Sequence, residues 1–440
     1  MVGDLITQYK DEIIHHLTNL INIPSVQSTP EEGKPFGKNS AAALQYIIDL
    51  SQSFGFKCEN ADGYACHIEY GEGNDIIGVL VHLDVVPAGD GWTYPAFGGE
   101  IHDGKMYGRG VDDDKGPAIV ALYSLKALKD ASIKLKKRIR IIFGVGEETG
   151  MDDMKYYFSK FPVPQMGFSP DCGYPVINAE KGILQLSLSS PIINPIIGRY
   201  ELISANGGQA INIVPAKAKA VLKCLNKEAT LEITTNGKAA HGAWPEEGIN
   251  AVTQLFQHFK ELFTEPKTDL EKFILFINEY IAGELDGKSL NIDSEDSISG
   301  KLTVNLGHFT YEDGTIKISL DIRHPVTENV QPIINTLKEL ATKNNLNFEL
   351  DRYEKPNYIP AEHILIKTLS KAYEEITGQQ CKLKSIGGGT YARTLMGNGV
   401  GFGGCGGKNF HDADEYITID SMMEHARICT QAIYELGNKT

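Results

Sequence analysis

Two nearly continuous apolar runs in the first third of the chain predict strands that are buried on both faces of a sheet. The runs are residues 75–87, DIIGVLVHLDVVP, and residues 138–145, RIRIIFGV. Between them, residues 116–128 place alanine and leucine side chains on one helical face, with Pro117 in the expected first turn. The order strand, helix, strand predicts an α/β fold.

A different pattern begins near residue 182, where apolar and polar residues alternate over short segments. Three strand-like segments have this alternation, and the last contains an Asn236-Gly237 turn signal: residues 183–190, 216–225 and 230–242. Two helical patterns and a further strand pattern follow: residues 248–263, 328–343 and 317–323. These residues are predicted to form a separate α+β domain.

The last part of the chain returns to the first pattern. A helical pattern at residues 362–377 precedes glycine-rich segments. We therefore predict one α/β domain made of residues 1–182 and 356–440, with an α+β domain of residues 183–355 inserted into it. Within the insertion, the polar stretch 286–299 is predicted to be a surface loop.

The first residues predict an amphipathic helix, because Leu5, Tyr9, Ile13 and Leu17 recur every four positions. Charged residues lie among them, so the segment lacks the apolar stretch of a secretion signal. No other apolar run approaches the ~20 residues that a membrane span requires. We expect a soluble protein without a membrane partner.

Composition and charge narrow the possible partners. The chain has 440 residues, 42% of them hydrophobic, which is enough for two or more domains. Its net charge of -15 describes an acidic surface that repels nucleic acid, and the basic stretch 134–140 is predicted to be a solvated turn before a strand. The seven cysteines form no CxxC pair, which favours reduced thiols in a cytoplasmic protein.

Candidate metal ligands begin in the first buried strand. His82 and Asp84 are two residues apart, so both point from one face of this strand at its carboxyl end, where open α/β sheets bind ligands. An imidazole is a good zinc ligand, and a neighbouring carboxylate can hold the other ring N–H. Standing alone, the pair would be read as a histidine satisfied by a nearby acid.

Acidic residues follow at two further places. Asp112, Asp113 and Asp114 precede the predicted helix, and one carboxylate can bridge two ions about 3.5–4 Å apart. Asp112 could instead complement the helix N-terminus. Glu147 and Glu148 follow the second buried strand, so one can bind metal while the other acts as a general base; the alternative is an exposed pair at a strand end.

Asp171 and His411 complete the set, although each is ordinary by itself. Together the motifs supply two imidazoles and several carboxylates, a mixed nitrogen and oxygen ligand set suited to zinc, with manganese also acceptable. Because the motifs come from distant parts of the chain, their joint presence predicts a site for two divalent metal ions.

The motifs and their order resemble the zinc-dependent dipeptidase, carboxypeptidase and aminoacylase family of co-catalytic metallopeptidases. The segments most similar to its PepV-type bacterial dipeptidases, which are relatives of carnosinase, are VHLDVVPAGDGW, YGRGVDDDKGP, GEETGM, SPD and IGGGTYAR. The resemblance covers nearly the whole chain. It implies a mixed-sheet metallopeptidase catalytic domain, an inserted lid domain and two divalent ions, with Zn(II) preferred over Mn(II).

The resemblance also implies roles for the ligands. Asp113 would bridge the two ions, one held by His82 and Asp171 and the other by Glu148 and His411. Two more acids are then expected to act at the same site: Glu147 as the general base, and Asp84 as the residue that orients His82. In this family the peptide bond after the bridging aspartate, here Asp113-Asp114, is often cis.

Further residues match the family's substrate contacts. His241 would donate to the developing oxyanion after domain closure, and its alternative is a histidine of a capped hairpin. Arg323 would receive the substrate carboxylate, although an arginine at a strand end is often only an ion-pair partner. Less specific contacts are expected from Asn212, Gly388, Gly389 and Thr390.

These observations predict a cytoplasmic metal-dependent dipeptidase whose substrates are short peptides with a free N-terminus. The alternatives are a deacylase of N-acyl amino acids that uses the same two metals, and a catalytically silent binding module. The inserted domain is enlarged around residues 263–301, as in PepV-type enzymes, and the resemblance therefore implies a monomer.

Overall fold

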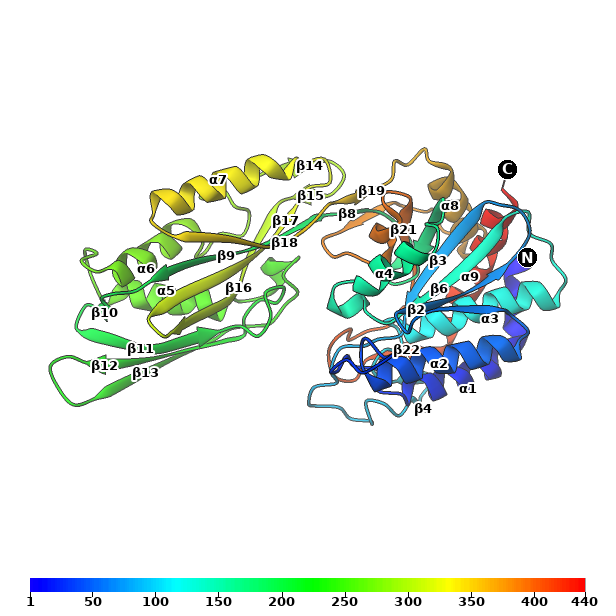
Figure 1. Ribbon diagram of the computed structural model, residues 1–440, viewed down its shortest axis with the longest axis horizontal. Coiled ribbons are helices and arrows are strands. Elements are labelled where there is room, and N and C mark those ends of the chain that lie inside the picture. Colours follow the sequence, from blue (N-terminus) through cyan, green and yellow to red (C-terminus); the bar gives the residue numbers. More distant parts are fainter. Residues whose placement is uncertain (440) are drawn as a thin grey trace. The chain divides into compact units, whose positions relative to one another are not determined.

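The computed structural model describes residues 1–439, which form two compact units (Figure 1). The first unit contains Met1–Ala179, Asn357–Lys384 and the residues from Gly389 on, and the second contains Glu180–Pro356 and Ser385–Gly388. The second unit is thus an insertion that also takes up a short later segment. The expected domain limits, 1–182, 183–355 and 356–440, stay a prediction.

The first unit is built on a mixed sheet. Its neighbouring strands, in spatial order, are β1 (Cys58–Ala61), β2 (Ala65–Tyr70), β6 (Arg138–Gly144), β3 (Ile76–His82), β7 (Met166–Ser169), β21 (Gly399–Gly403), β8 (Gly173–Glu180) and β19 (Asn357–Tyr358). β3 is parallel to β6 and β7, and β21 is parallel to β7, whereas β2 and β8 are antiparallel to their neighbours. This arrangement confirms the predicted α/β fold.

Both faces of the central strand β3 are buried, as its apolar run predicts. Val79 and Val81 pack on one face with helices α1 (Lys10–Ile21), α2 (Lys38–Ser53), α3 (Lys115–Asp130), α8 (Ile364–Thr377) and α9 (Ile419–Asn438). Leu80 points to the other face, toward α4 (Asp152–Lys160) and the 3-10 segment η4 (Tyr391–Leu395). The remaining strands of this unit are β4 (Glu100–His102), β5 (Lys105–Tyr107) and β22 (Tyr416–Thr418). Strand β20 (Lys384–Ile386) begins at the last residue of a first-unit segment and continues in the second unit.

The N-terminal segment differs in detail from the predicted continuous helix. A 3-10 segment, η1 (Val2–Tyr9), precedes α1. Because 3-10 side chains repeat every three residues, Ile6 and Tyr9 are buried, and the four-residue repeat continues through Ile13 and Leu17. Leu5, which the four-residue pattern placed in the core, is only partly buried.

The second unit contains an antiparallel sheet with helices on one face. Its strands are β9 (Gly182–Pro191), β10 (Ile196–Ile197), β11 (Tyr200–Gly207), β12 (Lys217–Cys224), β13 (Thr230–Asn236), β16 (Thr303–Glu312), β17 (Thr315–His324) and β18 (Asn347–Glu354), with β14 (Glu295–Asp296) and β15 (Gly300–Lys301) as a separate pair. The helical segments are η3 (Pro245–Glu247), α5 (Ala251–Glu261), α6 (Asp269–Tyr280) and α7 (Val330–Lys343). This α+β unit agrees with the predicted fold class.

Alternation along β17 separates a core face from a polar face. Ile316, Ile318, Leu320 and Ile322 pack with α5, α6 and α7. The intervening residues, which include Asp321 and Arg323, therefore point away from these helices. The segment 286–299, predicted as a surface loop, is partly packed into the same core, since Leu290 and Ile292 are buried there.

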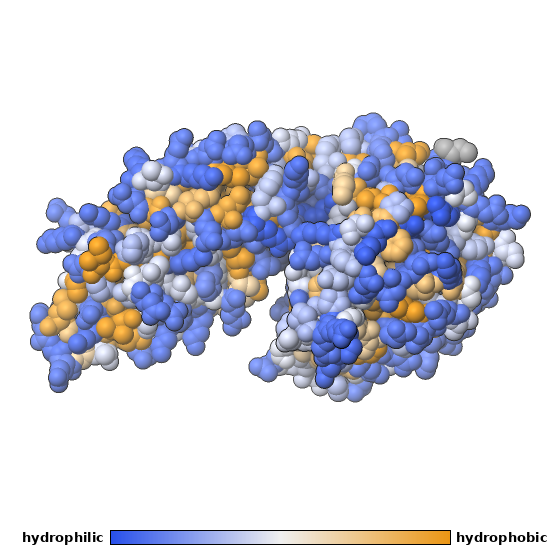
Figure 2. All heavy atoms as spheres, viewed as in Figure 1, coloured by the Kyte–Doolittle hydropathy of each residue, from blue (hydrophilic) through white to orange (hydrophobic). Residues whose placement is uncertain are grey.

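The face of the protein drawn in Figure 2 is mostly hydrophilic, with apolar residues scattered over it. Among residues 1–439, no helix is both long enough and apolar enough to cross a membrane. All seven cysteines are free thiols.

Candidate metal centre

The predicted ligands of the first unit lie where neighbouring strands end. His82 is the last residue of β3, Glu147 and Glu148 form the 3-10 turn η2 (Glu147–Thr149) after β6, and Asp171 follows β7. Since β6, β3 and β7 are parallel neighbours, their carboxyl ends meet at one edge of the sheet. Asp113 comes from the segment before α3, and the Asp113-Asp114 peptide bond is cis.

These side chains converge around Asp113. The Nε2 atom of His82 lies 2.9 Å from Oδ1 of Asp113 and 3.7 Å from Oδ2 of Asp171. On the other side, Nε2 of His411 lies 3.0 Å from Oδ2 of Asp113 and 3.2 Å from Oε1 of Glu148. Each oxygen of Asp113 therefore faces a different imidazole.

Two groups of potential ligand atoms result, and they share Asp113. One contains His82, Asp113 and Asp171, and the other contains Asp113, Glu148 and His411; within each group the ligand atoms lie within 4.8 Å of one another. One carboxylate common to two groups is the arrangement that a pair of neighbouring divalent ions needs. The sequence-predicted ligands are thus brought together in one place.

Burial raises the pKa of most carboxyl groups in this cluster. It raises the pKa of Asp171 to about 7, and the negative charge of Asp113 adds to the effect. The same two causes raise the pKa of Glu148, and burial together with Asp171 raises that of Glu147 well above its usual range. The raised pKa values show that these buried carboxylates are unstable as neighbouring negative charges. A bound cation would stabilise their charged forms.

The pKa values of the two imidazoles and of Asp113 shift against the effect of burial. Although burial opposes the change, a hydrogen bond with Asp113 and the close carboxylate of Glu148 raise the pKa of His411 to about 11. Burial likewise opposes the rise in the pKa of His82, which the close carboxylates of Asp113 and Asp171 push well above its usual range. The same two imidazoles hold the pKa of Asp113 well below its usual range against the effect of burial. Divalent cations would replace the protons that these imidazoles carry.

Three buried atoms support this fit. Nε2 of His82 and the Oε1 atoms of Glu147 and Glu148 are shielded from solvent, yet among the described residues none has a well-directed hydrogen bond. Polar atoms in such a position are costly unless they have partners. Metal ions coordinated by His82 and Glu148 would satisfy two of these atoms, and a water molecule held near Glu147 would satisfy the third.

Asp84 contacts this centre in two ways. Its backbone carbonyl oxygen lies 3.0 Å from Nδ1 of His82, whereas its carboxylate is 3.5 Å from that nitrogen. The carboxylate oxygens accept the backbone N–H groups of Glu147 and Glu148 at 3.3 and 3.1 Å. The histidine ring is thus oriented mainly by a carbonyl, while the carboxylate holds the turn that carries the two glutamates.

Sequence reasoning missed the contacts through which other buried acids hold ligand-bearing segments. Asp153 accepts the backbone N–H groups of Val145 and Gly146, directly before the glutamate turn, at 2.8 and 2.9 Å. Asp114 accepts the backbone N–H of His82 at 3.0 Å. Asp153 resembles an ordinary acid in the first turn of a helix, so its sequence context carries no signal of this contact.

In the second unit, Arg323 is buried and held by Asp321. Its Nε and Nη2 atoms donate to the carboxylate at 2.7–3.2 Å, and Nη1 donates to the carbonyl oxygen of Gly387 at 2.8 Å. Both residues lie on the polar face of β17. Asp321 was not predicted, although its position two residues before Arg323 in a strand places both side chains on the same face.

His241 and Asn212 are joined through their backbones in the same unit. Gly242 donates its N–H to the carbonyl oxygen of Asn212 at 2.7 Å, and Ile213 forms a β-bridge with His241. The buried amide of Asn305 donates to the carbonyl oxygens on both sides of Asn212, at 3.2 and 3.1 Å. The two predicted substrate contacts therefore belong to one fixed backbone arrangement.

The remaining predicted contacts fall in a connecting segment. Gly388 is the last residue of the second unit's short segment, and Gly389 begins the final part of the first unit. Thr390 accepts the backbone N–H of Ala392 with its side chain and so caps η4. Thr390 consequently has a local structural role in addition to its expected one.

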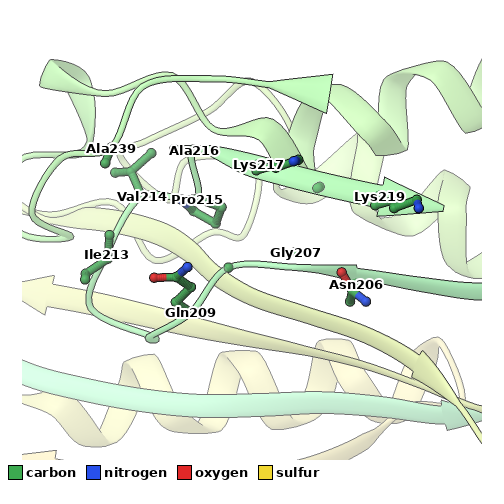
Figure 3. A pocket seen from close by; sticks show the side chains of 12 residues that line it. Asn206, Gly207, Gln209, Ile213, Val214, Pro215, Ala216, Lys217, Lys219 and Ala239 are labelled. Carbon is green, nitrogen blue, oxygen red and sulfur yellow. The ribbon is translucent and has the colours of Figure 1, made fainter. Parts of the chain in front are cut away.

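The second unit also contains a cavity of about 360 Å³ beside β11 and β12 (Figure 3). Asn206, Gln209, Lys217 and Lys219 contribute its polar side chains. None of the sequence-predicted site residues lines this cavity. Its lining includes Ile213, which follows Asn212 in the chain and forms a β-bridge with His241.

Comparison with known proteins places the chain among peptidases. Residues 78–435 match peptidase family M20/M25/M40. The Bacillus subtilis (strain 168) protein named "Putative dipeptidase YtjP" is 39% identical and is matched over 97% of this chain and 98% of its own length. A Staphylococcus epidermidis protein named "Putative dipeptidase" is 32% identical, with 99% of both chains covered.

Solved structures share the fold at much lower identity. Human carnosine dipeptidase 1 is 15% identical, with a TM-score of 0.65 over 99% of this chain and 98% of that chain. The Saccharomyces cerevisiae dipeptidase Dug1p is 14% identical, with a TM-score of 0.64 over the same shares. The sequence match over most of the chain and the nearly full-length relatives lead to one conclusion: this protein is a member of peptidase family M20/M25/M40.

Proposed function

We propose that this protein is a metal-dependent dipeptidase that hydrolyses short peptides with a free N-terminus. The observation that carries the proposal is the convergence of two imidazoles and two carboxylates on the shared Asp113, together with the buried Oε1 atom of Glu147, which is unpaired within residues 1–439. Relatives that are named dipeptidases and matched over nearly their whole length support the substrate class. Zinc is the preferred metal, and manganese is the alternative.

The proposed residue roles follow from this geometry and from the resemblance to the family. His82, Asp171 and Asp113 would hold one ion, and Glu148, His411 and Asp113 the other. Two such ions supply Lewis acidity, which makes a water more acidic and a carbonyl more electrophilic. Glu147 accepts the proton of the attacking water and delivers it to the departing amine.

Residues of the second unit are proposed to recognise the substrate. Arg323 binds the substrate carboxylate through the edge formed by Nη1 and Nη2, because Asp321 occupies the Nε edge of the guanidinium. His241 donates a hydrogen bond to the oxyanion that forms at the scissile carbonyl. Asn212, which shares a fixed backbone arrangement with His241, is a second contact, and Gly388, Gly389 and Thr390 are proposed to line the substrate pocket.

A monomer in the cytoplasm is proposed as the working form of this dipeptidase. The seven free cysteines suit a reducing compartment. The enlarged inserted unit supports a chain that needs no second copy to complete its site. Light scattering during gel filtration checks this, and a mass twice that of the chain would contradict it.

Metal removal tests the mechanism. Dialysis against a chelator should abolish dipeptide hydrolysis, and addition of zinc or manganese should restore it. The bound metal is quantified in the same samples. Activity that persists after the metal content has fallen to near zero would reject the proposal.

Substrate comparison tests the class of bond. A dipeptide should be cleaved much faster than its N-acetylated form, because the proposed substrate has a free amine. Preference for the acetylated form would identify the protein as a deacylase of N-acyl amino acids. A tripeptide serves as the length control and should be a poor substrate.

A further inference from the structure

Two buried acids that are not candidate ligands link the segments that carry Asp113 and His411. We call these segments the Asp113 loop (residues 108–114) and the His411 loop (residues 404–416). Glu415 belongs to the His411 loop and bonds to the Asp113 loop, whereas Asp112 belongs to the Asp113 loop and bonds to the His411 loop. The two contacts are therefore reciprocal.

Glu415 binds the backbone of the Asp113 loop at several points. Its Oε2 atom accepts the N–H of Gly110 at 3.0 Å and is paired with the guanidinium of Arg109 at 2.8 Å. Its Oε1 atom accepts the N–H of Asp112 at 3.1 Å and lies 3.5 Å from that of Asp113. The Glu415 backbone also accepts the N–H of Gly108 at 3.0 Å. The backbone on both sides of Asp112, up to the proposed bridging residue, is thus held by one carboxylate.

Asp112 makes the opposite connection. One of its oxygens accepts the backbone N–H of Gly407 at 2.8 Å, and the other accepts that of Cys405. The close fit leaves no space for a larger residue at position 407, since a Cβ there would lie 2.7 Å from the Asp112 carboxylate. The start of the His411 loop is therefore fixed by a side chain adjacent to Asp113.

The His411 loop is also held by a β-bridge between Lys408 and Tyr416 and by Asp414, whose carboxylate accepts the N–H and the hydroxyl of Thr93 at 2.7 Å. Asp112 and Glu415 add the backbone contacts that join it to the Asp113 loop. The His411 loop has positive φ angles at Asn409, His411 and Asp414, and the His411 side chain is 49% exposed. Burying carboxylates such as Asp112 and Glu415 is costly unless their oxygens have partners, and backbone N–H groups supply most of those partners here. Only Arg109 forms an ion pair with either acid among the described residues.

We propose that Asp112 and Glu415 are positioning residues which lock the Asp113 and His411 loops together, so that the ligands of the second ion are in place before the ion binds. The inference rests on the metal centre of the proposed function. It predicts that the group formed by Asp113, Glu148 and His411 depends on this lock more than the group formed by His82, Asp113 and Asp171. Neither His82 nor Asp171 lies in a segment that Glu415 or Asp112 contacts.

Cobalt binding to the full-length, metal-free protein tests the inference. Co(II) is titrated by calorimetry, and its visible absorption is recorded for wild type, Glu415→Gln and Asp112→Asn. Each substitution keeps the size of the side chain but replaces one carboxylate oxygen, which accepts a backbone N–H, with an NH₂ group, which cannot accept it. We expect one of the two sites to weaken by about 10- to 100-fold, the usual effect of removing a residue that supports a ligand. The absorption bands of that site should change as well.

Glu69→Gln is the matched control. Glu69 also pairs with arginine, with Arg140 at 2.7 Å, but it lies on β2, which carries no proposed ligand. This variant should keep both cobalt affinities and the wild-type spectrum, even where its thermal stability falls. Weakening in all variants alike would show general destabilisation and would overturn the inference.

The remaining outcomes separate the inference from the proposed function. Wild-type affinities and spectra in both Glu415→Gln and Asp112→Asn would overturn the positioning role while leaving the dipeptidase proposal in place. A wild-type protein that binds no divalent cation would instead reject the proposed function. If Glu415→Gln does not fold, Asp112→Asn decides, because it keeps the ion pair between Arg109 and Glu415.

Discussion

Glu147 and Glu148 are neighbours in sequence, but their surroundings differ. Oε1 of Glu148 lies 3.2 Å from the imidazole of His411 and belongs to a group of potential ligands, whereas Glu147 belongs to neither group. The 3-10 turn separates the two side chains, and both backbone N–H groups are held by Asp84. This geometry supports the different roles proposed for the two glutamates.

Glu147→Gln should therefore separate catalysis from metal binding. We expect kcat to fall by about 10²- to 10⁴-fold, because glutamine cannot accept a proton from the attacking water. Metal content and KM should change little. Steady-state kinetics with metal analysis checks this, and Glu148→Gln provides the contrast, since it should lose metal as well as activity. Equal metal loss in both variants would contradict the assignment of Glu147.

At the scale of residues, the sequence was most informative about side chains with unusual chemistry. His82, Asp113, Glu148, Asp171 and His411 could be proposed because imidazoles and carboxylates at strand ends point to metal binding. Residues that act on backbone N–H groups could not be found this way, because any backbone segment can accept such a contact. The sequence suggested that Asp112 could complement the helix N-terminus, but its carboxylate accepts the N–H groups of Cys405 and Gly407 instead.

The strands of the first unit position the site because parallel neighbours end at a common edge. The apolar runs predicted β3 and β6 well, since both strands are buried on two faces. β3 ends at His82, earlier than the apolar run 75–87 implies, and Glu147 and Glu148 lie in a 3-10 turn and not in a continued strand. Hydrophobic patterning reports burial, and these segments remain buried after the strand has ended, so the pattern could not show the change of conformation.

His67 on β2 makes the stability of this sheet sensitive to acid. Burial, with a further contribution from Arg140, lowers the pKa of His67 from 6.5 to about 4. The unfolded chain binds this proton near pH 6.5, but the folded protein binds it only near pH 4. The stabilisation is therefore present above pH 6.5 and is lost as the pH falls toward 4, by about 3 kcal/mol in total.

Urea unfolding of wild type and His67→Asn between pH 4 and 7 measures this contribution. Asparagine keeps a polar group near the hydroxyl of Tyr157, which lies 2.8 Å from Nδ1 of His67. We expect the variant to be less stable at pH 7 but to lose less stability on acidification. Parallel curves for wild type and His67→Asn would contradict the prediction.

On the scale of the whole molecule, every proposed metal ligand lies in the first unit. Ligand binding stabilises the folded form of the part that binds, by about 2.7 kcal/mol when the free ion is at a hundredfold excess over its Kd. Metal should therefore stabilise the first unit selectively. The change in hydrophobic pattern near residue 182 is the sequence signal for a second unit, and the predicted limits rest on it. Ser385–Gly388, which lie in the second unit, carry no such signal, because four residues are too few to show a period.

Hydrogen exchange with and without chelator measures this selectivity. Removing metal should speed exchange in the Asp113 loop, the His411 loop and the turn at residues 145–149. Residues 183–355 should exchange at the same rate in both conditions. A uniform acceleration across both units would show that metal binding stabilises the chain as a whole.

The position of β21 constrains how the protein can be made in the cell. β21 lies between β7 and β8 in the sheet, although these two strands are close in sequence and β21 comes more than two hundred residues later. During translation, His82, Asp113 and Asp171 are synthesised long before β21, the strand that separates β7 from β8. The nascent N-terminal region must therefore keep a gap in its sheet, with the residues proposed to bind the first ion already synthesised. The gap closes when β21 and His411 are made, within about the last tenth of the chain.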